Sequence, residues 1–172
     1  MVVVVIVGVL AMLAVVGYRK LVQSAHVAEA TSMVHNIRVA QEAYHAETQQ
    51  YAAISTDLTS FYPRTSTYGI VTGWGGACTN CQQDMNWNQL PLHVDGPVLF
   101  GYATVAGPAQ VGAPALPNGA DKCNYQQYSG ATTPDWYMIA AQADLDGLSS
   151  TPPTTVCGTS WTNQIVVVNE GQ

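Results

Sequence analysis

The sequence contains unusually little charge for its length. Only 9% of its 172 residues are charged, against about 25% in an ordinary soluble domain. Five basic residues face eleven acidic ones, and the net charge of −6 lies entirely beyond residue 54. Nucleic-acid binding is therefore not expected, because it needs clustered Lys and Arg side chains to neutralise phosphates. A chain so poor in charge needs a lattice, a membrane or glycans to stay dispersed.

Helix-breaking residues are missing from most of the first third of the chain. No Pro precedes Pro63, and no Gly lies between Gly17 and Gly69. Residues 1–17 contain no charged side chain, so this run must be buried in lipid or protein. A cleaved signal peptide is the alternative reading. It is disfavoured because no basic segment precedes the run and Tyr18-Arg19-Lys20 follows it, where small residues are expected.

An amphipathic pattern continues directly after the apolar run. Four residues recur every seven positions between Leu21 and the end of this region: Ala30, Ile37, Tyr44 and Tyr51. We expect them to form the helix face that packs on the rest of the protein or on neighbouring molecules. One helix is thus predicted from Met1 to about Ala52, roughly 78 Å long, with its hydrophobic half projecting from the domain.

The composition changes after Ser55 to Gly, Pro, Thr, Ser and Asn, which is typical of turns and short strands. Strands are predicted at 98–105, 136–143 and 165–169, with a weaker one near 68–72. The segment 149–155 is expected to be an exposed loop. We predict an α+β protein with a small antiparallel sheet and long pinned loops. Its parts are a hydrophobic helix over 1–20, an amphipathic continuation over 21–54 and a globular β domain over 55–172.

Cysteine is absent from the first 77 residues, and four occur beyond them: Cys78, Cys81, Cys123 and Cys157. An even number in a candidate exported domain indicates two disulfides, and the sequence does not choose among three connectivities. A zinc site is less favoured, because only one close Cys pair is present and no His lies at finger spacing.

Several segments together resemble the type IV pilin superfamily of pili and type II secretion pseudopilins. Residues 1–11 (MVVVVIVGVLA) resemble the hydrophobic block after the family's Glu-Leu dipeptide, with Gly8 at its helix glycine. Residues 40–44 (AQEAY) followed by Tyr51 resemble the family's helix end. The segments 143–147 (ADLDG) and 168–171 (VNEG) are similar to parts of pilin-like β domains. The family's Glu near the mature N-terminus and the Pro that ends its apolar run have no counterpart here, and we expect the mature N-terminus to lie upstream of Met1.

The resemblance implies a structural subunit that assembles by helix packing. Its expected partners are copies of itself in a filament, inner-membrane lipid before assembly, and the pilus or secretion assembly machinery. The expected location is an extracellular cell-surface filament that is anchored in the inner membrane before assembly. The filament-core residues would be Met1, Val5, Gly8, Met12, Val16 and Gly17.

Sites for other chemistry are sparse in the sequence. No G-x-S-x-G motif or phosphate-binding glycine loop occurs, so no catalytic residue or enzyme activity is expected. Asp144 and Asp146 before Gly147 resemble the opening of a calcium loop, although Thr155 occupies the position where an EF-hand has Glu. Calcium is therefore the one possible cofactor.

Three functions fit these observations. The first is a major pilin, and the second is a pseudopilin or minor pilin. The third is a membrane-tethered exported binding domain, which would use the helix only as an anchor. A tether needs no second apolar stripe from Ala30 to Tyr51, so the stripe favours assembly.

Overall fold

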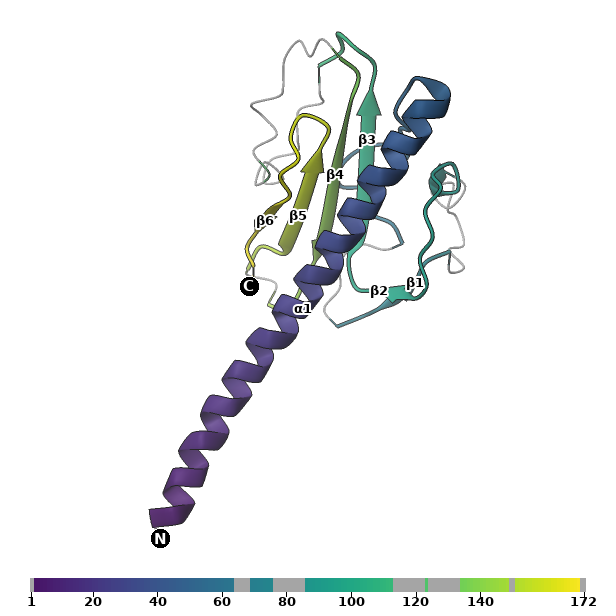
Figure 1. Cartoon of the computed structure of the whole chain (residues 1–172). Coiled ribbons are helices and arrows are strands. Elements are labelled where there is room, and N and C mark those ends of the chain that lie inside the picture. The colour runs from purple at the N-terminus through teal and green to yellow at the C-terminus, as the bar shows by residue number, and fades with distance from the viewer. Residues whose placement is uncertain are drawn as a thin grey trace.

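The molecule is built on one uninterrupted helix, α1 (Val2–Thr48), of 47 residues. The computed structural model describes residues 2–63, 69–75, 86–112, 123, 134–148 and 151–170. Figure 1 shows α1 crossing the sheet with its second half, while its first half extends away from the domain. We call residues 2–21, all of which are exposed, the stem, and residues 22–48 the shaft. The predicted single helix is confirmed over this range.

The helix ends four residues before the predicted end. Gln49 takes a left-handed conformation with φ of 59°, and its N–H donates to the carbonyl of His45 over 2.8 Å. This is the usual way in which a chain leaves an α-helix and caps its last carbonyls. Tyr51, predicted on the helix, therefore lies in the loop that turns back toward the sheet.

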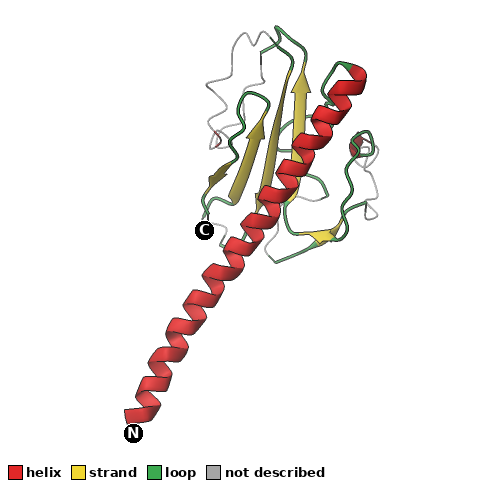
Figure 2. Cartoon of the chain, viewed as in Figure 1, coloured by secondary structure: helices red, strands yellow, loops and turns green. Residues whose placement is uncertain are grey.

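Four antiparallel strands form the main sheet in the order β3–β4–β5–β6. They are β3 (Gly101–Gly107), β4 (Trp136–Ala143), β5 (Thr154–Thr159) and β6 (Val166–Val168). Two short strands, β1 (Thr72–Gly73) and β2 (Pro97–Val98), pair beside it (Figure 2). The α+β class with a small antiparallel sheet is confirmed.

Strand β5 was not predicted, and part of its sequence was expected to be an exposed loop. That expectation is wrong for Thr154, which is fully buried, and for Thr155 beside it. The hydroxyl of Thr154 donates to the carbonyl of Asn169 over 2.8 Å, so its polar atom is satisfied inside the sheet. The two preceding prolines and the run of hydroxyl residues conceal the strand in the sequence.

The sheet is covered on both faces. On the face toward α1 lie Tyr137, Ile139, Ala141 and Val156, in the cluster that contains the shaft. The alternate residues Trp136, Met138, Ala140 and Cys157 belong to a second cluster on the other face. Successive side chains of a strand point to opposite faces, and this double burial explains why residues 136–143 read as one continuous apolar run.

Two features fix α1 and the chain after it against the sheet. Gly158 leaves room for the helix, since a Cβ there would lie 3.0 Å from Cγ1 of Val34. The segment after α1 then runs along the edge of β3. Tyr62 and Tyr102 exchange both backbone hydrogen bonds, at 2.8 and 2.7 Å. This segment covers an edge that would otherwise be open to another chain.

Candidate functional site

The stem is an apolar surface that the residues described in the structure leave exposed. Its large hydrophobic side chains from Val2 to Val16 are between 53% and 77% exposed. The predicted filament-core residues Val5, Met12 and Val16 are among them, and a Cβ on Gly8 or Gly17 would meet no atom within 4 Å. Met1 lies outside the described residues. This part of α1 is long and apolar enough to span a membrane, a property that signal sequences share.

The shaft buries one face against the sheet. Its buried residues are Val27, Ala30, Met33, Val34, Ile37, Ala40 and Gln41. Of the four residues predicted on this face, Ala30 and Ile37 are fully buried, and Tyr44 and Tyr51 are half-buried against the same cluster. The spacing of three and four residues is that of one side of a helix. The stripe read from the sequence thus packs on the chain's own sheet.

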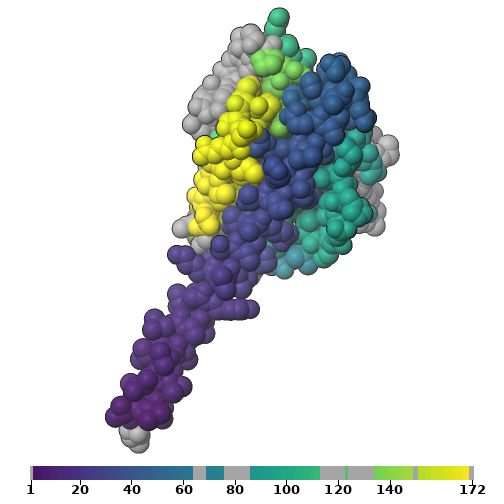
Figure 3. All heavy atoms as spheres, viewed as in Figure 1, coloured from purple at the N-terminus to yellow at the C-terminus, as the bar shows by residue number. Residues whose placement is uncertain are grey.

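The opposite side of the shaft remains exposed along its length. Figure 3 shows this outer face between the yellow C-terminal segment and the teal segment on its other side. Ala25, Ser32, Val39 and Ala46 lie on it, seven residues apart, and all are exposed. Residues at this spacing stay on nearly one line of a helix. Three of the four side chains, those of Ala25, Ser32 and Ala46, are small and let two helices approach closely. This outer stripe was not recognised in the sequence.

Gln41 joins the shaft to the returning chain. Its Nε2 donates to the carbonyl of Ala52 and its Oε1 accepts the N–H of Ala52, both over 2.9 Å. Nε2 also donates to Oγ1 of Thr104 in β3 over 3.2 Å. Gln41 is fully buried, and a buried amide is stable only when its polar atoms are paired. One polar side chain therefore holds helix, loop and strand together.

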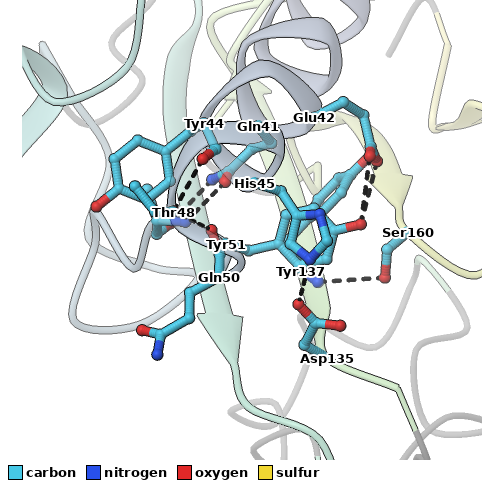
Figure 4. A network of polar contacts seen from close by, with 11 residues as sticks. Gln41, Glu42, Tyr44, His45, Thr48, Gln50, Tyr51, Asp135, Tyr137 and Ser160 are labelled. Carbon is cyan, nitrogen blue, oxygen red and sulfur yellow. Dashed lines mark hydrogen bonds and ion pairs between the residues drawn. The ribbon is translucent and has the colours of Figure 1, made fainter.

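A polar network lies at the C-terminal end of α1 (Figure 4). Glu42 accepts hydrogen bonds from the hydroxyls of Tyr137, at 3.2 Å, and Tyr51, at 3.3 Å. His45 stacks on Tyr51 with ring centroids 4.4 Å apart and pairs with Asp135 over 2.7 Å. Burial, followed by the Glu42 carboxylate, raises the pKa of Tyr51 well above its usual range. Burial also raises the pKa of Tyr137.

Arg38 joins the middle of the shaft to the loop between β5 and β6. Its guanidinium donates to the carbonyl and side-chain oxygens of Asn163, both over 2.9 Å. It also donates to the carbonyl of Thr162 over 3.2 Å. Arg38 is therefore engaged within the chain, whereas Arg19 and Lys20 lie at the exposed end of the stem.

A disulfide joins Cys123 to Cys157 in β5, across 34 positions of the sequence. It attaches a residue of the long connection between β3 and β4 to the face of the sheet opposite α1. Cys78 and Cys81 lie outside the described residues, so the second predicted disulfide stays a prediction.

The loop after β4 does not form a calcium cage in its described part. Oδ1 of Asp144 accepts the N–H groups of Asp146 and Gly147, at 3.2 and 2.7 Å. Asp146 accepts the N–H of Leu148 and the hydroxyl of Thr151, at 2.8 and 2.6 Å. Over the described ranges, no three His, Cys, Asp or Glu side chains gather at one point. Calcium takes six to eight oxygen ligands, so these carboxylates fit an Asp-rich turn better than a calcium site.

Comparison with known proteins identifies no relative of this chain. No family model, no curated protein and no solved structure matches the chain.

Proposed function

We propose that the protein is a subunit that assembles through its long helix into an extracellular filament of the type IV pilin kind. The observation behind the proposal is the division of α1. Its shaft packs on its own sheet, and its stem exposes an apolar surface from Val2 to Val16 that the described part of the chain leaves uncovered. Contiguous apolar surface of this extent belongs against a membrane or another protein. Membrane lipid before assembly and other copies after it would supply that cover.

A membrane-tethered exported binding domain is the candidate of a different class. The sequence argument against it used the stripe from Ala30 to Tyr51, and that argument fails because Ala30 and Ile37 are buried on the chain's own sheet. The outer face of the shaft now favours assembly. A tether does not require the outer stripe of Ala25, Ser32, Val39 and Ala46, whereas its three small residues and one apolar residue would allow a neighbouring helix to pack closely.

A charge on this stripe distinguishes the two functions. In Val39→Lys, filaments viewed by electron microscopy after detergent removal should become rare or absent, because the Lys would lie between adjacent helices. Val71→Lys is the matched control, since both valines are 56% exposed and Val71 lies outside α1. Abundant filaments in both variants would favour packing through another surface. Wild-type protein that stays monomeric without detergent would contradict the assembly proposal.

A further inference from the structure

A cleft lies at the place where the stem meets the domain. One wall is α1, with Tyr18, Arg19, Val22 and His26. The other includes the loop after β4, with Asp144, Leu145, Asp146 and Leu148. Its volume of about 510 Å³ is within the range of small-molecule sites. Residues far apart in the sequence thus line one hollow.

The two walls have opposite charge. Arg19 provides the cation on α1, and the ion pairs within 4.0 Å in the described part of the chain all involve histidines, so none engages Arg19. Asp144 and Asp146 provide two carboxylates on the loop. Hydrogen bonds hold both side chains in place, and the one from Thr151 lowers the pKa of Asp146, which is therefore ionised at neutral pH.

The position of the cleft along α1 indicates which layer of a membrane it would face. The apolar run from Val2 to Gly17 would extend about 24 Å, most of the roughly 30 Å of a bilayer's hydrocarbon core. Tyr18 and Arg19 follow immediately, and aromatic and basic side chains are favoured at the headgroup level. With the stem in a membrane, the cleft opens among phospholipid headgroups.

We propose that this cleft binds a zwitterionic phospholipid headgroup with a primary amine, phosphoethanolamine. The Arg19 guanidinium pairs with the phosphate, and the carboxylates of Asp144 and Asp146 accept hydrogen bonds from the ammonium. This inference rests on the membrane-anchored stage of the proposed function.

The carboxylates determine which headgroup is preferred. A primary ammonium has three N–H donors, whereas the trimethylated amine of phosphocholine has none. A phosphoglycerol headgroup has no cation, so its phosphate would bring net negative charge beside two carboxylates. The expected order is phosphatidylethanolamine first, with phosphatidylcholine and phosphatidylglycerol behind it.

Native mass spectrometry of the full chain in detergent, titrated with each synthetic lipid, tests this order. Phosphatidylethanolamine should be retained roughly three- to tenfold better than phosphatidylcholine, as expected for partly exposed charged hydrogen bonds. Arg19→Gln should lower retention of phosphatidylethanolamine by a similar factor. The double variant Asp144→Asn/Asp146→Asn should remove its advantage over phosphatidylcholine.

The controls separate this site from general attraction of basic residues to lipid. Lys20→Gln changes the charge equally at the next position, outside the residues that line the cleft, and should leave the preference unchanged. Arg19→Gln lies on the exposed stem and does not depend on the fold of the Asp loop. Equal retention of the ethanolamine and choline lipids by the wild type, or an ethanolamine preference that survives in the double variant, would contradict the proposal. Filament formation is scored on the same samples, so assembly without lipid preference counts against this inference alone.

Discussion

The two halves of α1 differ in what they contact, although one continuous helix contains both. The stem exposes apolar residues from Val2 to Val16, and the shaft buries Val34, Ile37 and Gln41 against the sheet. A helix that is apolar on all sides must be buried by lipid or by other molecules, whereas a helix with one apolar stripe can bury that stripe on its own domain. Mutations in the stem should therefore change assembly and membrane binding, and mutations on the buried face of the shaft should change folding stability.

The largest expected difference in unfolding free energy is between two substitutions by Ala, one in each half of α1. Ile37→Ala should lower the free energy of unfolding of the domain by about 2–5 kcal/mol, because it leaves a cavity at a fully buried position. Leu10→Ala, at a position 60% exposed, should leave that free energy unchanged. Denaturant titration of both variants in detergent, followed by tryptophan fluorescence, measures the difference. Equal losses would mean that the stem folds back onto the domain.

The disulfide should affect the domain alone. Replacing both partners, Cys123→Ala with Cys157→Ala, should cost about 3–4 kcal/mol of unfolding free energy, because the bond closes a loop of 34 residues. The same denaturant titration measures the loss. Membrane binding of the variant in a vesicle flotation assay should equal that of the wild type, since the stem is untouched. Impaired flotation would contradict the separation of the two regions.

Gln41→Ala tests the attachment of the shaft to the returning chain. The substitution leaves the buried N–H and carbonyl of Ala52 without their partner, which should cost about 1–3 kcal/mol. Gln50→Ala, at an exposed position close by, is the control and should change stability by less than about 0.5 kcal/mol. A loss no larger than that of the control would show that Gln41 does not hold the loop.

The smallest effect concerns pH and the network at the end of the shaft. The folded protein holds Tyr51 protonated above the usual tyrosine pKa of about 10. Stability from this group is thus fully present below about pH 10 and declines as the pH rises further, because the unfolded chain loses the proton first. Tyr51→Phe should flatten this decline in unfolding measurements between pH 8 and 12. If unfolding free energy declined with pH as steeply in Tyr51→Phe as in the wild type, the folded protein would not raise the pKa of Tyr51.

The helix and three strands of the main sheet were visible in the sequence because each has a strong pattern. The bounds of β4 agree with the prediction, and β6 lies within its predicted range. The predicted strand over 98–105 is divided, since Val98 pairs with Thr72 in the small sheet and β3 begins at Gly101. Strand β5 was missed because buried threonines resemble a loop when their hydroxyl partners are unknown.

The candidate sites were less predictable, because they depend on contacts between distant parts of the chain. The exposed stem follows directly from its composition. The cleft does not, since Arg19 and Asp144 line it together although they lie far apart in the sequence. The role of Gln41 was equally hidden, because a Gln on a helix is usually solvated.

The most direct test of the account is carbene footprinting of the full chain with a lipid-soluble photolabel, in vesicles and again after assembly without detergent. We predict strong labelling of residues 2–17 in vesicles, its loss in assembled particles, and no labelling of Val34 or Ile37 in either state. Stem residues that stay unlabelled in vesicles, or that remain equally labelled after detergent removal, would contradict the claim that lipid and then other copies cover the stem.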